Sequence, residues 1–161
     1  MTFTLGMKAA LTHTVKSSDL ASSWQNDMPV LATPILLWLA EITCMRAVES
    51  TLERGEMTLG CQHQISHLAP TPEGWIVTFT AELVAVDGKM LTFDIAAQDG
   101  ADRVLSGQHT RAVVSRDRFI DRVRRKDALR RPGSELPGTC TDVASARTRQ
   151  LRPLRLQMQP R

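Results

Sequence analysis

One segment constrains the fold more than any other: residues 31–50, LATPILLWLAEITCMRAVES, are almost continuously apolar. Thr33 followed by Pro34 predicts a helix that begins at this point, because a threonine oxygen can cap a helix and proline is favoured in the first helical turn. The Arg54-Gly55 pair predicts an end near Glu53. Apolar side chains surround this helix, so we expect other structure to wrap it.

Glu41 interrupts the apolar run and needs an explanation. A buried carboxylate costs several kcal/mol unless it is paired. It can face a subunit interface and meet Arg46 or another basic residue there, or it can be a functional acid. The helix by itself leaves both explanations open.

Before and after the helix, the apolar residues alternate with period two, which predicts strands. The expected strands cover residues 7–15, 57–69, 75–86, 89–98 and 103–115. Asp87-Gly88 is a strong hairpin signal between the third and fourth of them. Helix and strands are segregated, so the class is α+β. A curved antiparallel sheet of about five strands wrapped around one long central helix is the hotdog fold.

Alternation along 57–69 predicts one apolar face, made of Met57, Leu59, Cys61, Ile65 and Ala69. The opposite face then holds Thr58, Gln62, Gln64 and Ser66. His63 and His67 share the parity of the apolar face, which should meet the helix.

Charge divides the chain into two unlike parts. Residues 1–115 hold 7 basic and 12 acidic residues, a net of −5, whereas residues 116–161 hold 13 and 5, a net of +8. We expect one folded domain over 1–126, with a short basic helix at 119–126, and a basic, disordered tail over 127–161. The tail has almost no aromatic residues for base stacking, so nucleic-acid binding beyond non-specific attraction is not expected.

The chain lacks the patterns of export and of metal binding. Its first twenty residues do not resemble a signal peptide, and no run of eighteen apolar residues occurs. Three scattered cysteines, Cys44, Cys61 and Cys140, show no zinc or redox spacing. We therefore predict a cytoplasmic protein with no membrane association, no metal and no cofactor.

His67 facing a helix that carries Glu41 is a pairing with chemical consequences. Burial and a neighbouring carboxylate shift the pKa of a histidine in opposite directions, and a value near the working pH suits a general acid or base. A hydrogen-bonded structural histidine is the commoner case, and that interpretation is kept for His63 and His109.

Four segments resemble the fluoroacetyl-CoA thioesterase family of hotdog proteins, across about residues 29–125. They are ATPILLWLAEITCMRA (32–47), GEMTLGCQHQISHLAPTPEG (55–74), VTFTAELVAVDGK (77–89) and AAQDGADRVLSGQHTRAVV (96–114). The family's functional residues correspond to Thr33, Glu41, Gly60, His67 and Arg111.

The resemblance implies hydrolysis of an acyl-CoA thioester to a carboxylate and free CoA, with CoA entering as part of the substrate. Thr33 with Glu41 would form or orient the nucleophile, and His67 would transfer protons. The helix start and the backbone at Gly60 would stabilise the oxyanion, and Arg111 would assist CoA binding or brace the site.

The segment 17–30 is polar and reads as a loop or a partly helical lid. The family carries phenylalanines on this lid, whereas this chain has SSWQNDMPV, which places Trp24 near one of those positions and Asp27 near another. A small or medium acyl group other than fluoroacetyl is therefore expected, with Trp24 among the substrate-binding residues.

Eight helical residues rise about 12 Å, so Thr33 and Glu41 cannot touch on one straight helix. Either Thr33 lies in a folded-back loop or a partner subunit supplies one of the two residues, and we predict a homodimer, or a higher oligomer of dimers, with a shared site. The alternatives are a hotdog hydratase or dehydratase, and a non-catalytic module that binds acyl-CoA.

Overall fold

In the computed structural model, which describes residues 2–130, the apolar segment forms helix α1 over Thr33–Val48. Its N-terminal cap is Ala32, whose carbonyl accepts hydrogen bonds from the amides of Ile35 and Leu36. The expectation that Thr33 caps the helix was therefore wrong. Thr33 is the first helical residue, and its hydroxyl is engaged elsewhere.

The helix also ends earlier than predicted. A 3₁₀ turn over Glu49–Thr51 replaces the last turn that was expected to reach Glu53. The tighter turn brings the chain back to the sheet, where Leu52 packs against the hydrophobic core. Tertiary packing here outweighs the stop signal at Arg54-Gly55.

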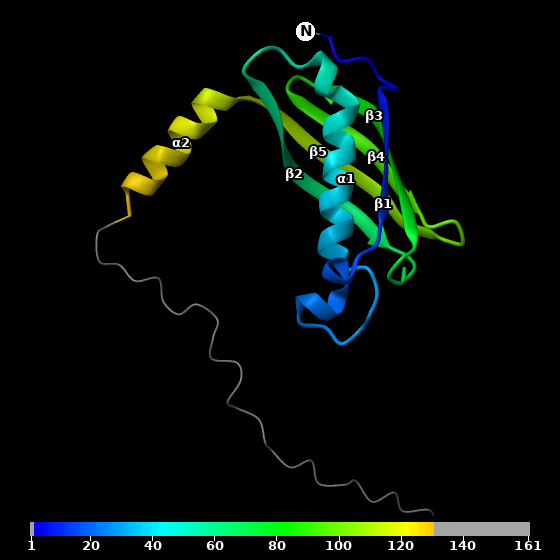
Figure 1. Ribbon diagram of the computed structural model, residues 1–161. Coiled ribbons are helices and arrows are strands. Elements are labelled where there is room, and N and C mark those ends of the chain that lie inside the picture. Colours follow the sequence, from blue (N-terminus) through cyan, green and yellow to red (C-terminus); the bar gives the residue numbers. More distant parts are fainter. Residues whose placement is uncertain (1, 131–161) are drawn as a thin grey trace, which may run out of the picture.

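Five strands form one antiparallel sheet in the order β1-β3-β4-β5-β2 (Figure 1). Their bounds are β1 Lys8–Thr14, β2 Glu56–His67, β3 Ile76–Asp87, β4 Met90–Gln98 and β5 Arg103–Ser115. The predicted strands and the α+β hotdog architecture are confirmed. The predicted lid consists of two short 3₁₀ turns, Ser17–Asp19 and Ala21–Trp24.

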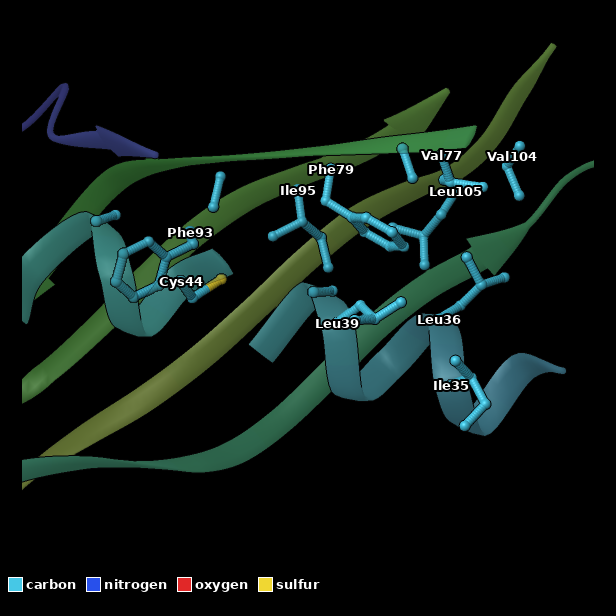
Figure 2. Close-up of a cluster of buried hydrophobic side chains, with 14 of the residues drawn as sticks. Ile35, Leu36, Leu39, Cys44, Val77, Phe79, Phe93, Ile95, Val104 and Leu105 are labelled. Carbon is cyan, nitrogen blue, oxygen red and sulfur yellow. The ribbon is translucent and has the colours of Figure 1, made fainter. Parts of the chain in front are cut away.

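The core lies between α1 and the sheet. Leu36 and Leu39 of the helix are buried opposite Phe79 of β3 (Figure 2). Burying a side chain of this size contributes roughly 1.5–3 kcal/mol, so these contacts stabilise the position of the helix on the sheet.

The outer side of α1 was expected to be covered, but the sheet of one chain covers only the inner side. Trp38 is 56% exposed and Met45 is 45% exposed. Figure 1 shows α1 lying in front of the sheet, between the edge strands β1 and β2. An apolar strip of the helix is thus left open in a single chain.

Strand β2 contains a bulge, and the predicted face assignment holds for the residues beyond it but not for those before it. The pairing with β5 shifts between Gly60 and Gln62, so Cys61 is an extra residue. An extra residue reverses the alternation beyond it. Thr58 is buried and Cys61 is exposed, opposite to the prediction, whereas His63 and His67 face the helix as predicted.

Helix α2 spans Arg116–Ala128, longer at both ends than the predicted 119–126. It leaves the end of β5 and projects away from the sheet (Figure 1). The predicted tail over 127–161 lies outside the described residues from 131 onward. Between residues 2 and 130, no helix is long and apolar enough to cross a bilayer.

Candidate functional site

The polar residues of interest lie along the seam between α1 and β2, which run antiparallel. Thr33 at the helix start meets His67 at the end of β2, and Glu41 meets His63. Eight helical residues rise about 12 Å, and four strand residues span about 13 Å. The seam therefore carries two separate polar groups about 12 Å apart.

Thr33 and His67 form the first group. The Thr33 hydroxyl lies 2.9 Å from His67 Nδ1, and His67 Nε2 lies 3.1 Å from the carbonyl oxygen of Ala69. A carbonyl only accepts, so in the neutral imidazole Nε2 carries the proton and Nδ1 accepts the threonine O–H. The pair is thus arranged for proton transfer from Thr33 to His67.

The lid holds the start of α1, and with it Thr33. The buried Asp19 side chain accepts hydrogen bonds from His13 Nε2 at 2.7 Å and from the Lys16 amide at 2.9 Å. The Asp19 backbone carbonyl accepts the Ala32 amide at 2.9 Å. The helix cap is therefore tied to both the lid and strand β1.

Glu41 is the centre of the second group, and both its oxygens are engaged. Oε1 accepts from His63 Nε2 at 2.9 Å, and Oε2 accepts from Arg111 Nη1 at 3.2 Å. Burial favours a raised pKa for this carboxyl, but the hydrogen bonds from Arg111 and His63 outweigh it and hold the pKa of Glu41 below its usual value. Glu41 therefore pairs with residues of the sheet rather than with Arg46.

Arg111 is 2% exposed and holds the second group together from its buried side. Its Nε donates to the Thr58 hydroxyl at 3.0 Å, and its Nη2 donates to the Thr58 carbonyl at 3.0 Å. Its Nη1 donates to His109 Nε2 at 2.9 Å as well as to Glu41. Within one chain, this arrangement supports the bracing role more than direct contact with CoA.

His109 is fully buried and is held as a neutral imidazole. Its Nε2 accepts from Arg111, so its Nδ1 donates to the Gln62 carbonyl at 3.0 Å. Burial lowers the pKa of His109 to about 4, and the Arg111 charge acts in the same direction. The His63 ring stacks on it with a centroid separation of 4.1 Å and an interplanar angle of 17°.

Gly60 lies where the Glu41 carboxylate crosses β2. A Cβ atom at this position would lie 2.7 Å from Glu41 Oε1 and 3.1 Å from His109 Cε1. Such contacts are too short for a side chain. Glycine at this position therefore allows the carboxylate to approach the strand backbone.

The structure thus divides the predicted site residues. Thr33 is on the straight helix, so the folded-back loop offered as one explanation is ruled out. Trp24 ends the second 3₁₀ turn of the lid and is 51% exposed, and Asp27 is also exposed. A substrate-binding role for Trp24 stays a prediction.

Sequence reasoning kept a hydrogen-bonded structural interpretation for His63 and His109, and both are hydrogen-bonded in the structure, but it did not predict that they belong to the group around Glu41. The four-residue spacing of His63 and His67 on one strand already placed both on the face toward the helix. The two-residue spacing of His109 and Arg111 on β5 placed both on one face, whereas the contact of His109 with the Gln62 carbonyl depends on the β2–β5 pairing and had no local signal.

Glu41, His63 and His109 place ligand-type atoms within 4.8 Å of one another. Arg111 Nη1 already occupies His109 Nε2 and one oxygen of Glu41, and its positive charge would face any bound cation. The geometry therefore favours an arginine-centred hydrogen-bond network over a metal centre, and the absence of a metal stays a prediction.

The chain is similar to known proteins in sequence and in fold. Residues 15–117 match a family described as fluoroacetyl-CoA-specific thioesterase. A fluoroacetyl-CoA thioesterase of Streptantibioticus cattleyicolor is 43% identical over 97 residues, which cover 60% of this chain and 70% of that protein.

Solved structures show the same fold. One structure of fluoroacetyl-CoA thioesterase has a TM-score of 0.73 and 34% identity, and the match covers 78% of this chain and 98% of the other. A hot-dog-like protein from Thermanaerovibrio acidaminovorans has a TM-score of 0.72 and 25% identity, with 77% and 93% of the two chains covered.

Proposed function

The chain belongs to the fluoroacetyl-CoA-specific thioesterase family, and from this premise we propose that it hydrolyses an acyl-CoA thioester to a free carboxylate and CoA. The observation that carries the proposal is the hydrogen-bonded Thr33–His67 pair at the start of α1. Its tautomer is set by the Ala69 carbonyl, so the His67 lone pair faces the hydroxyl.

The reaction needs an activated nucleophile, a stabilised oxyanion and a protonated leaving group. His67 Nδ1 accepts the proton of the nucleophile, which is the Thr33 hydroxyl or a water molecule beside it. At the start of α1, Pro34 has no N–H and the amides of Ile35 and Leu36 already donate to the Ala32 carbonyl. The Thr33 amide, together with the positive end of the helix dipole, stabilises the negative charge that develops on the thioester oxygen. Protonated His67 then returns the proton to the CoA thiolate as the C–S bond breaks. Attack by water gives the carboxylate directly, whereas attack by Thr33 leaves an acyl-threonine ester, which a water molecule that gives its proton to His67 hydrolyses to the carboxylate and the free hydroxyl.

We propose that a second copy of the chain completes the site. Glu41 lies about 12 Å along the helix from Thr33, which is too far for both residues of one chain to act on one carbonyl. Strand β2 is an edge strand of the described sheet, and Trp38 and Met45 leave an apolar strip on α1. Edge-to-edge pairing of two sheets would cover both features and bring the partner's polar groups closer.

The acyl group is proposed to be small or medium and not fluoroacetyl. Trp24 and Asp27 occupy the lid, and an exposed aspartate does not provide an apolar contact for a fluorinated group. Cytoplasmic location is proposed because Cys44 and Cys61 are free thiols, as is usual in a reducing compartment.

Thiol release from acyl-CoA esters, from acetyl to octanoyl, tests the activity. The wild-type protein should release CoA from at least one ester, and Gln64→Ala, on the exposed side of β2, should match it. Tight binding of these esters without any hydrolysis would replace the enzyme by a binding module.

A mixing experiment tests the shared site. Thr33→Val and Glu41→Gln are each expected to keep about a hundredth of wild-type activity or less alone. Refolding the two together should restore about a quarter of wild-type activity, because half of the dimers are mixed and each has one intact site. No recovery in mixed dimers would show that each site uses residues of one chain. A monomer with full activity would contradict the dimer itself.

A further inference from the structure

The Glu41 carboxylate is held differently at its two oxygens. At Oε2 the donor is Arg111, a buried and permanently charged residue. At Oε1 the donor is His63, whose side chain is 27% exposed. His63 is therefore the donor to Glu41 that is in contact with solvent.

His63 is itself placed with little freedom. Its ring stacks on His109, and His109 is fixed by hydrogen bonds at both ring nitrogens, to the Gln62 carbonyl and to Arg111. The bulge at Cys61 turns His63 toward the helix, since without the extra residue the alternation from Thr58 would direct it to the opposite face. A bulge, a stack and a hydrogen bond thus act on one side chain.

We propose that His63 is a positioning residue for the reaction: stacked on His109, it donates to one oxygen of Glu41 while Arg111 donates to the other, and so holds the carboxylate ionised and oriented. This inference rests on the proposed thioesterase function. It assigns a role to a residue for which sequence reasoning kept a structural interpretation.

The charges around His63 support this role. Glu41 faces it from α1, and His109 and Arg111 lie next to it from the neighbouring strand β5. Cys44, also on α1, stays a neutral thiol because burial raises its pKa to about 12. Among these neighbours Glu41 is the anion, so the His63 hydrogen bond acts on Glu41 and helps to lower the pKa of that carboxyl.

Removing the donor should therefore raise the pKa of Glu41. If the reaction uses the ionised carboxylate, the acidic limb of kcat/KM contains a step for Glu41 in addition to the step for the base His67, and the Glu41 part of this limb moves to higher pH. A residue that only fills space would change the overall rate and the stability, but it would leave this limb in place.

The experiment compares His63→Ala, His63→Phe and His63→Gln with wild type and with Gln64→Ala as the matched control. His63→Phe keeps an aromatic ring for the stack but has no donor, whereas the amide of His63→Gln keeps a donor without the imidazole. For each protein, kcat, KM and the pH profile of thiol release are measured, together with the thermal unfolding temperature.

His63→Ala and His63→Phe should lower kcat about tenfold with little change in KM, and should shift the acidic limb upward by about one pH unit. His63→Gln should recover most of both. Wild-type kcat and an unmoved limb in a folded His63→Phe protein would overturn the inference.

A titration of the Glu41 side-chain carbon by NMR separates the two proposals. The apparent pKa of Glu41 should rise in His63→Phe, in an experiment that needs no substrate. An unmoved pKa in active enzyme would overturn the role of His63 alone. If the pKa of Glu41 rises in His63→Phe but the wild-type protein hydrolyses no ester, the thioesterase function is overturned and, with it, the catalytic use of this contact.

Discussion

The two ends of the α1–β2 seam are built in different ways. At one end, Thr33 and His67 are both exposed and share one side-chain hydrogen bond. At the other end, Glu41 accepts a hydrogen bond from buried Arg111, which also donates to buried His109. The Thr33–His67 pair is therefore accessible and weakly coupled to the core, whereas the Glu41 group is anchored in it.

This contrast predicts which substitutions affect stability. Changes at the Thr33–His67 end should alter turnover with little effect on the free energy of unfolding. Changes in the Glu41 group should alter both, because its buried members leave polar atoms without partners when one is removed.

Arg111→Met should have the largest effect. It removes the donor to Glu41, His109 and Thr58. Breaking a fully buried ion pair costs about 3–5 kcal/mol, and because the Glu41 side chain is 34% exposed, solvent screening places the expected loss at or below the lower end of that range. Urea unfolding measures the loss. The control is Arg46→Met on the exposed side of α1, with an expected change within about 0.5 kcal/mol. Equal stabilities for the two variants would remove the contrast between the ends.

His109 should make stability depend on pH. Its pKa is about 4 in the folded protein and about 6.5 when unfolded, so acid protonates the unfolded state first. The free energy of unfolding should fall by up to roughly 3 kcal/mol as the pH drops from 6.5 to 4. In His109→Gln, which does not titrate, this part of the slope should vanish in urea unfolding at several pH values. An unchanged slope would place the titrating group elsewhere.

At the open end, Thr33→Val and His67→Ala should each lower turnover about a hundredfold, because each removes a partner in proton transfer. Their free energies of unfolding should stay within about 0.5 kcal/mol of wild type. Thiol release and urea unfolding on the same preparations check both statements. A large loss of stability would show that this end, too, is part of the structural support.

Gly60→Ala should give the smallest of these effects. Its Cβ would lie 2.7 Å from Glu41 Oε1, so the carboxylate must move away from the strand, and kcat should fall about tenfold. Ser66→Ala, on the exposed side of the same strand, serves as the control. Wild-type kcat in Gly60→Ala would indicate that the position of this oxygen is not critical.

Local patterns in the sequence were sufficient for the elements and the class of fold. The long apolar run with its Thr33-Pro34 start, the two-residue period and the Asp87-Gly88 turn predicted α1 and the five strands to within about two residues at most ends, because these signals depend on near neighbours. The fixed rise of a helix also separated Thr33 from Glu41, and the described structure keeps them on one straight helix.

Only the tertiary structure decided which side chains meet. One extra residue at Cys61 reverses the faces of β2, and no local signal announces it. Arg111 reaches Glu41 across 70 positions of the chain, and His109 reaches the Gln62 carbonyl across 47. Such contacts depend on strand register and helix placement, which are set by packing of the whole core rather than by neighbours in sequence. The sequence by itself thus singled out Thr33, Glu41 and His67 as candidates, and the fold decided which of them meet and what supports Glu41.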